Sequence, residues 1–481
     1  MKQITLKFKN LINSKYCFWL VCGLATFFGT LSLAVGKDLF SYLATFLAIF
    51  FLIFSDHKKN LYLIMYCQSI FNLLGFPLSV GGALTYLVIV YLVVVLVDCF
   101  LHPHPIGSKV WKAVLLFCCF VLLTFSTSFL NRSVVSLASA FSFYAYMCFL
   151  IAVILEACHE DERFQKSVMA LEIGLLVDTV IGLVCLLTPN LRERIYLSDY
   201  DKTYSFSSLL FGDYRFQGLN SDQNEFSMCS LIPACFFLAF NEKFKKHRAL
   251  CWSITMLNLS LGFLGKSKSY LICLLFFALF YVLKFAKKKK DSLIIILGIA
   301  FCVLGFFSLL SGSLFTEKIF SRFINVSTAS GYFLDYLTTS RWSLWITYSN
   351  YLLARPVQLI FGQGIKSMYS SMATIGTTVS HNFFLNTIWE FGVIGTLLFF
   401  AFLVVTSGYR LYRSEGYRNV LCLLPIATFF LFGTGLALTG SSEIFFYFVL
   451  FFLSNQMRNT EIDSGVVDKE GLSLRVMRCQ I

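Results

Sequence analysis

Apolar runs of about 20 residues follow one another along most of the chain, and short polar connectors separate them. A helix that spans a bilayer needs about 20 mostly apolar residues, and it pairs its own backbone polar groups where lipid offers no partner. The pattern therefore predicts an all-α, polytopic integral membrane protein with about 14 transmembrane helices. We expect spans at 16–36, 39–55, 61–80, 83–101, 110–130, 134–155, 167–188, 222–240, 249–265, 269–286, 292–311, 382–406, 419–439 and 442–457.

Two polar connectors are much longer than the others. Loops above about 15 residues usually carry function or are disordered, and the second of these contains tryptophans, tyrosines and apolar patches that indicate a folded loop. The two loops divide the chain into N-terminal transmembrane helices (1–188), a first extracytoplasmic loop (189–221), central transmembrane helices (222–311), a large extracytoplasmic loop (312–380), C-terminal transmembrane helices (381–457) and a polar cytoplasmic tail (458–481).

The large loop contains one segment with helical spacing, which begins at Arg341. Trp342 and Trp345 recur at that spacing, and both residue types favour the membrane interface. We therefore expect an amphipathic interfacial helix here. The flanking signals are a cap at Thr338, Thr339 or Ser340, a stop at Arg355-Pro356 and a turn at Gly362-Gln-Gly364.

Composition and charge agree with a membrane protein. Only 14% of the residues are charged and 57% are hydrophobic, whereas soluble domains carry about 25% charged residues. Of the 39 Lys and Arg residues, 26 fall on one side of the predicted topology and 13 on the other. This bias predicts that both termini lie in the cytoplasm. It also accounts for the net charge of +13 without a nucleic-acid partner.

His381 lies where the large loop re-enters a predicted span. The other histidines fall on the cytoplasmic side of this topology: His57, His102, His104, His159 and His247. An imidazole titrates near neutral pH and is suited to general base catalysis, and a helix N-terminus favours its neutral form. The alternative is a capping or interfacial histidine.

Several cations lie on the outer side, against the charge bias: Arg215, Lys266, Lys268 and Arg341. Most of them are at or near a predicted helix N-terminus, where backbone N–H groups and the helix dipole favour anions. Arginine adds a planar fork that fits a phosphate. The set suggests a pocket for a phosphorylated lipid head group. The alternative is that each cation only anchors a helix end to lipid phosphates.

Acidic residues give weaker signals. Asp222 has the spacing of a helix N-cap, and Glu225 would complete a capping box. Glu390 lies within a span, where a carboxylate is either functional or bonded to another helix; it is about 180° around a regular helix from His381. The same two alternatives apply to Asp178 and Asp98. No metal-ligand spacing is present.

Four motifs in order resemble those of the O-antigen ligase and polysaccharide polymerase (Wzy-type) superfamily. The fourth motif combines a histidine and an asparagine at the start of a span with a glutamate and a glycine farther along the same span. The motifs are Arg215 with Gly218-Leu-Asn-Ser-Asp-Gln-Asn224, Leu264-Gly-Lys-Ser-Lys-Ser, Thr339-Ser-Arg341 with Trp345 and Phe361-Gly-Gln-Gly364, and Ser380-His-Asn-Phe-Phe-Leu with Trp389-Glu-Phe-Gly-Val-Ile-Gly.

The resemblance implies a GT-C-like, inverting, metal-independent glycosyltransferase without a cofactor, which acts on undecaprenyl-diphosphate-linked sugars in a bacterial cytoplasmic membrane. By position, Arg215 and Arg341 would hold the diphosphate and His381 would activate the acceptor hydroxyl. Lys268 stands where many relatives have arginine. The further substrate-binding residues expected are Lys266, Lys268, Asn224, Asn382 and Glu390.

We predict a polymerase that joins lipid-linked repeat units into a capsular, exopolysaccharide or O-antigen chain. A flippase and a chain-length regulator are its expected partners, beside membrane lipid. A ligase would use the same donor with another acceptor. From another class, a lipid-linked oligosaccharide flippase or other transporter would show internal repeats, and none is visible. A sensor or scaffold has no signalling domain to support it.

Overall fold

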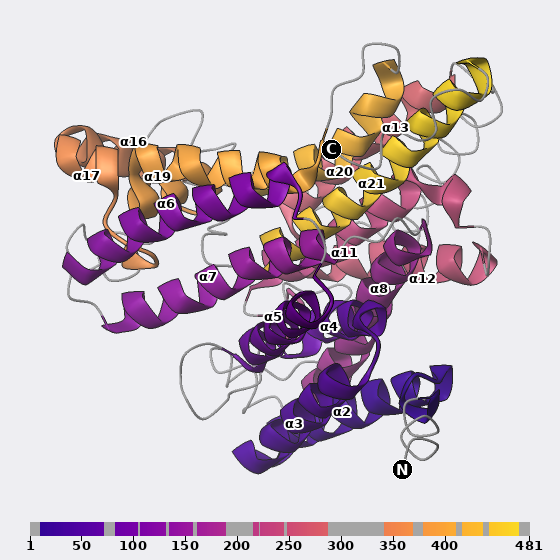
Figure 1. Ribbon diagram of the computed structural model, residues 1–481. Coiled ribbons are helices and arrows are strands. Elements are labelled where there is room, and N and C mark those ends of the chain that lie inside the picture. Colours follow the sequence, from indigo (N-terminus) through magenta and orange to yellow (C-terminus); the bar gives the residue numbers. More distant parts are fainter. Residues whose placement is uncertain are drawn as a thin grey trace, which may run out of the picture.

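The structure is a computed structural model, and it describes residues 10–71, 82–103, 106–130, 134–156, 161–188, 215–220, 222–244, 248–286, 341–368, 379–409, 416–435 and 442–470. Within these ranges every regular element is a helix (Figure 1). The elements are α2 Lys15–Val35, α3 Asp38–Phe54, α4 His57–Phe71, α5 Ala83–Leu101, α6 Ser108–Leu130, α7 Val134–Leu155, α8 Asp161–Leu187, α11 Gln223–Ala239, η1 Asn241–Lys243, α12 Arg248–Gly262, η2 Phe263–Gly265, α13 Lys268–Ala286, α16 Arg341–Leu353, α17 Pro356–Phe361, α19 Phe383–Ser407, α20 Gly416–Gly433 and α21 Glu443–Glu470.

These helices confirm an α-helical membrane protein. They overlap with the predicted spans except 292–311, which lies outside the described residues, as does 72–80 of the span predicted at 61–80. Helix α21 runs to Glu470, beyond the predicted end of its span at 457. Among the described residues, five helices are long and apolar enough to cross a membrane: Lys15–Val35, Ala83–Leu101, Ser108–Leu130, Glu162–Leu186 and Phe383–Ser407. Large apolar side chains face outward, such as Phe100 at 86% exposure, whereas carboxylates such as Glu172 are fully buried. The count of 14 spans stays a prediction.

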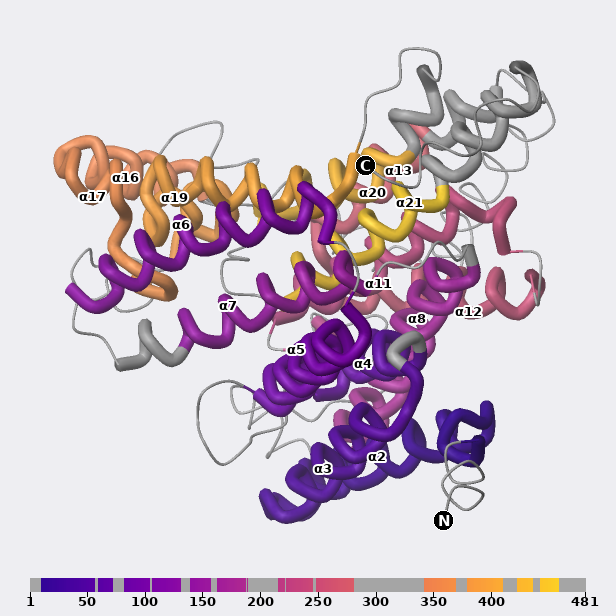
Figure 2. The backbone as a smooth tube through the Cα atoms, in the orientation of Figure 1, coloured from indigo at the N-terminus to yellow at the C-terminus, as the bar shows by residue number. Residues whose placement is uncertain are grey.

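The helices pack into one bundle, and α6 and α19 run side by side within it (Figures 1 and 2). Aromatic rings fill the space between α6, α7, α19 and α21. The ring centroids of Phe120 and Phe391 are 5.0 Å apart, and those of Phe143 and Phe445 are 5.1 Å apart. Such pairs add about 0.5–1.5 kcal/mol each beyond their burial. This core sets the position of α19.

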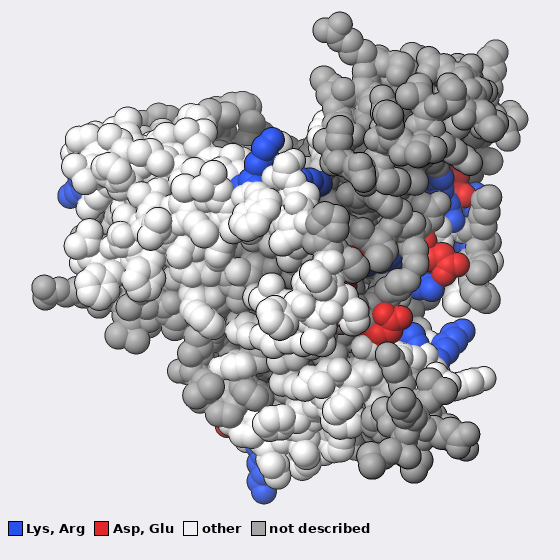
Figure 3. Space-filling model, viewed as in Figure 1, with Lys and Arg blue, Asp and Glu red and all other residues white. Residues whose placement is uncertain are grey.

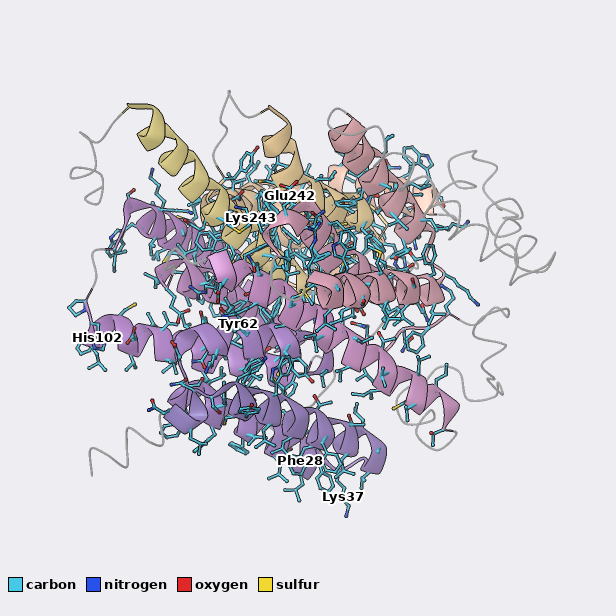
Figure 4. The ribbon with its side chains drawn as sticks, turned by 90° about the vertical axis from the view of Figure 1, so that its right-hand side faces the viewer. Phe28, Lys37, Tyr62, His102, Glu242 and Lys243 are labelled. Carbon is cyan, nitrogen blue, oxygen red and sulfur yellow. The ribbon has the colours of Figure 1, made fainter. Side chains whose placement is uncertain are left out.

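The surface agrees with a lipid-facing bundle. On the face shown in Figure 3, few charged side chains interrupt an otherwise uncharged described surface. Figure 4 shows Lys37, which precedes α3, at the lower edge of the molecule and His102, which follows α5, at its left edge.

The described part of the large loop, residues 341–368, forms two helices at one end of α19 (Figure 1). Helix α16 begins at Arg341, as predicted, and ends before Arg355-Pro356. The predicted capping residues lie outside the described residues. Helix α17 was not predicted from the sequence; it begins with Pro356 at its first position, where the missing N–H costs no hydrogen bond.

The predicted turn at Gly362–Gly364 is present, and it packs against an unpredicted break in α19. The break is at Gly392, with φ 68° and ψ 176°, and Gly362 has φ 80° and ψ −179°. A Cβ atom on Gly362 would lie 2.5 Å from the Gly392 nitrogen. The backbone N–H groups of Gln363 and Gly364 donate to the carbonyl oxygens of Trp389 (3.0 Å) and Glu390 (2.9 Å). We call residues 362–364 and 389–392 the glycine junction.

Candidate active site

Helix α16 packs along the first turns of α19. The Trp345 indole N–H donates to the Ser380 carbonyl oxygen (2.9 Å). The rings of Tyr348 and Tyr351 pack against Trp389, with centroid distances of 5.2 and 5.0 Å. Since Ser380 directly precedes the predicted base, these contacts and the glycine junction fix α16 beside it.

Arg341 is the first residue of α16 and reaches the end of α20. Its Nη1 donates to the Gly435 carbonyl oxygen (2.7 Å). A Cβ atom on Gly435 would lie 2.9 Å from this nitrogen and 2.7 Å from the Ser269 hydroxyl, so glycine allows α16 and the start of α13 to meet here. Burial lowers the pKa of Arg341, and the negative charge of Asp222 raises it. The guanidinium stays cationic because arginine is not deprotonated in proteins.

His381 lies directly before α19 in a left-handed backbone conformation, with φ 49°. The next residue, Asn382, caps the helix: its side-chain oxygen accepts the N–H groups of Phe384 (3.0 Å) and Leu385 (3.1 Å). Burial, and then the Arg341 charge, lower the pKa of His381 below its ordinary value, whereas Asp222 raises it. The net shift favours the neutral imidazole, which is the form that accepts a proton.

Asp222 is the N-cap of α11, as the sequence predicts. One carboxylate oxygen accepts the N–H groups of Asn224 (2.6 Å) and Glu225 (3.4 Å). The same carboxylate acts electrostatically on both Arg341 and His381. The beginning of α11 is therefore near enough for its Asp222 charge to act on residues at the beginnings of α16 and α19, although these segments are far apart in sequence.

Arg215 is held by two of the motifs that the sequence singled out. Its Nε donates to the Gly265 carbonyl oxygen (3.0 Å), and its Nη2 donates to the Asn224 side-chain oxygen (2.7 Å). The adjacent Phe216 N–H donates to the Leu264 carbonyl oxygen (2.9 Å). Both bonds to residues 264–265 fix the arginine against the turn between α12 and α13.

That turn rests on the first turns of α11. A Cβ atom on Gly265 would lie 2.1 Å from the Ser227 hydroxyl, which donates to the Gly262 carbonyl oxygen (3.2 Å). Lys266 has a left-handed backbone, with φ 46° and ψ 40°. Lys268 is the first residue of α13, and both lysines are half-buried. The predicted helix-terminus position of Lys268 is therefore confirmed.

The turn at residues 265–269 joins the two halves of the site. At one end, its Gly265 carbonyl oxygen accepts the Arg215 Nε–H. At the other end, its Ser269 hydroxyl lies close to Gly435, whose carbonyl oxygen accepts a hydrogen bond from Arg341. Arg341, His381 and Asp222 are mutually coupled by their charges. The contacts of this turn therefore connect Arg215 to the residue that binds Arg341, and the charge of Arg341 in turn acts on His381.

Glu390 has a different environment. It is fully buried in α19, two residues before the Gly392 break, and its carbonyl oxygen is part of the glycine junction. The charges that act on the His381 pKa are those of Arg341 and Asp222. The Glu390 backbone therefore belongs to the packing of the large loop on α19.

Two features of the site escaped the sequence. Asp222 was interpreted as a helix cap, and Gly435 belonged to no motif. Strained backbone is a third signal, and only the coordinates reveal it: across the described ranges, the non-glycine residues with positive φ are Lys266, Lys366 and His381. Such conformations cost about 1–3 kcal/mol and gather at functional sites. Among the described residues, no cluster of His, Cys, Asp or Glu is arranged to bind a metal ion.

Comparison with known proteins gives one finding. Residues 253–400 match the family model described as O-antigen ligase. This segment contains the turn at 265–269, α16, the glycine junction and His381, whereas Arg215 lies before it. The comparisons with curated proteins and with solved structures gave no match. The family match confirms the resemblance that the motifs predict.

Proposed function

Because residues 253–400 carry an O-antigen ligase family domain, we propose that the protein is a polymerase of lipid-linked glycan repeat units. In this proposal, it transfers undecaprenyl-diphosphate-linked oligosaccharides onto a growing chain at the outer face of a bacterial cytoplasmic membrane. The observation that supports it best is that Trp345 of α16 donates to the Ser380 carbonyl oxygen (2.9 Å), which holds the helix that begins at Arg341 beside His381. The charge of Arg341 helps to lower the pKa of His381 and so favours the neutral imidazole.

The reaction is a single displacement. The acceptor sugar hydroxyl attacks the anomeric carbon, a new carbon–oxygen bond forms, and the bond from that carbon to the diphosphate oxygen breaks. The diphosphate leaves on the lipid with its negative charge, and the hydroxyl proton passes to His381. Attack opposite the leaving group inverts the anomeric centre. The activated glycosyl–diphosphate bond supplies the driving force without a nucleotide or metal.

Arg215 and Arg341 would stabilise the charge that develops on the diphosphate. Each guanidinium is already oriented by bonds to a carbonyl oxygen, Gly265 for the first and Gly435 for the second. Donors oriented before the reaction need no rearrangement as charge develops. Lys266, Lys268, Asn224 and Asn382 would complete the binding of the head group and the sugar, and Glu390 would support the loop.

Asp222 would stabilise His381 after the imidazole has accepted a proton. A base must be neutral before the reaction and must hold a proton after it. Burial and Arg341 favour the neutral form, and Asp222 favours the protonated form once it appears. The carboxylate therefore stabilises the imidazolium while the leaving group departs.

A deletion of the base in cells tests the proposal. With His381→Ala at normal protein level, long polysaccharide should be lost, and lipid-linked single repeat units should accumulate on the outer face. His102→Ala is the matched control, because His102 is exposed at the end of α5 and contacts Asp98 only through an i,i+4 pair. Accumulation on the cytoplasmic face would instead support a flippase, and long polymer that fails only to reach its final acceptor would support a ligase.

Orientation is tested separately. The proposed arrangement has both termini in the cytoplasm, so a reporter fused at Lys288 should read cytoplasmic and one near Ser330 external. The opposite pattern would move the site to the wrong face for an undecaprenyl-diphosphate donor that has already crossed the membrane. A flippase and a chain-length regulator would be its neighbours in the membrane.

A further inference from the structure

We propose that Asp178, a buried carboxylate on α8, positions Arg215 for the donor diphosphate; the donor part of this inference rests on the proposed function. Asp178 is fully buried, and its Oδ1 accepts the Leu219 backbone N–H (3.1 Å). The bond joins a transmembrane helix to the loop before α11 that carries Arg215. The sequence left open whether Asp178 bonds another span; it bonds a loop instead.

Two glycines bring the loop against α8. A Cβ atom on Gly182, one turn beyond Asp178, would lie 2.9 Å from the Gly218 Cα. A Cβ atom on Gly218 would lie 2.7 Å from the second Asp178 oxygen, and the φ of Gly218 is 61°. A side chain at either position would push the loop outward. The close approach places the Leu219 N–H within reach of the carboxylate.

The loop transmits this position to Arg215. Phe216 is fully buried, and its ring packs edge-to-face on Phe226 of α11 with a centroid distance of 5.0 Å. The same residue donates its N–H to the Leu264 carbonyl oxygen. Asp178 at one end of the segment and Leu264 at the other therefore define where the Arg215 guanidinium lies, although Asp178 itself does not touch the site.

The contact needs an acceptor oxygen rather than a charge. The second Asp178 oxygen is buried without a hydrogen-bond partner among the described residues. Asparagine keeps the acceptor for Leu219 and has the same shape, whereas leucine leaves that N–H buried and unpaired, which displaces the loop. Asp178→Asn should therefore restore most of what Asp178→Leu removes.

Glu172 on the same helix is the matched control. It is also fully buried, and its carboxylate accepts from Asn258 and Thr255 of α12 rather than from residues 215–220 in the described hydrogen bonds. Glu172→Leu therefore removes a buried carboxylate of α8 but leaves the bond between Asp178 and Leu219 in place. Any effect shared by both leucine variants reports general damage to the bundle.

Hydrogen exchange tests the positioning without any assumption about function. In the purified full chain, amides of residues 215–220 should exchange at least about tenfold faster in Asp178→Leu, since opening the loop exposes them. Asp178→Asn and Glu172→Leu should leave their exchange near that of the unmodified chain. Unchanged exchange in Asp178→Leu, or an equal rise in Glu172→Leu, would overturn the inference.

Binding of undecaprenyl diphosphate tests the link to Arg215. If only about a tenth of the molecules keep the loop in place, the apparent affinity falls about tenfold. Asp178→Leu should show that loss, and it should add little to Arg215→Gln, because both changes remove one interaction. Additive losses would refute the link. Failure of every variant and of the unmodified chain to bind this lipid would refute the proposed donor, and the exchange result would still decide the role of Asp178.

Discussion

The glycine junction makes Gly362→Ala a severe substitution although it adds one methyl group. The new Cβ atom would lie 2.5 Å from the Glu390 oxygen, the Gly392 nitrogen and the Phe391 carbonyl carbon, all of them backbone atoms that cannot turn away. The φ of 80° and ψ of −179° at Gly362 also belong to a region used almost only by glycine.

The cost of Gly362→Ala follows from these contacts. Backbone in this region costs a residue with a Cβ atom about 1–3 kcal/mol. Displacing the turn also breaks the bonds from Gln363 and Gly364 to α19, each worth about 0.5–1.5 kcal/mol. Together, about 2–6 kcal/mol opposes docking of α17 on α19. Even the lower figure changes the docked-to-undocked ratio about thirtyfold.

Because docking fixes α16, the expected result is loss of glycan transfer from a protein that is still inserted. Protein level in membranes, thermal unfolding and polysaccharide length measured together distinguish this from misfolding. Gly23→Ala is the matched control: it lies inside α2 with nothing within 4 Å of its Cβ position, so it should stabilise by about 0.5–1 kcal/mol and leave glycan unchanged. Wild-type polymer and unaltered unfolding in Gly362→Ala would refute the packing argument.

Two further substitutions examine the charges of the site. Asp222→Asn keeps the α11 cap but removes the charge that raises the His381 pKa. His381 then loses its proton at lower pH, so the acidic limb of the plot of kcat/KM against pH should move to lower pH. A shift to higher pH would contradict the effect assigned to Asp222. Arg215→Lys keeps the charge but loses the two-pronged contact with Gly265 and Asn224. Because Arg215 is proposed to stabilise charge that develops on the leaving diphosphate, kcat/KM should fall about tenfold, with kcat itself lowered. An unchanged kcat/KM would exclude this role for Arg215.

The sequence predicted the helices better than it predicted the contacts between them. Apolar runs revealed the helices because burial in lipid depends on local composition, and Arg341 and Asp222 were recognised as helix starts from local capping chemistry. The break at Gly392 was invisible, because a glycine in an apolar span is ordinary until the loop glycine that meets it is known.

Long-range electrostatics were hidden for the same reason. The effect of Asp222 on His381 joins residues 159 positions apart by their numbering, and only the fold brings them together. The Asp178 bond to Leu219 likewise crosses from one helix to a later loop. No local pattern encodes either pairing, whereas the four motifs did lead to the prediction that Arg215, Arg341 and His381 serve one site.

The central claim is that His381 accepts the proton of the attacking hydroxyl. Its most direct test is the transfer rate of the purified His381→Gln variant on a synthetic undecaprenyl-diphosphate-linked oligosaccharide, with undecaprenyl diphosphate binding measured on the same sample. Binding should be close to that of the unmodified chain, and the transfer rate should be lower by about 10²–10⁴-fold. Transfer within a few-fold of the unmodified rate would contradict it.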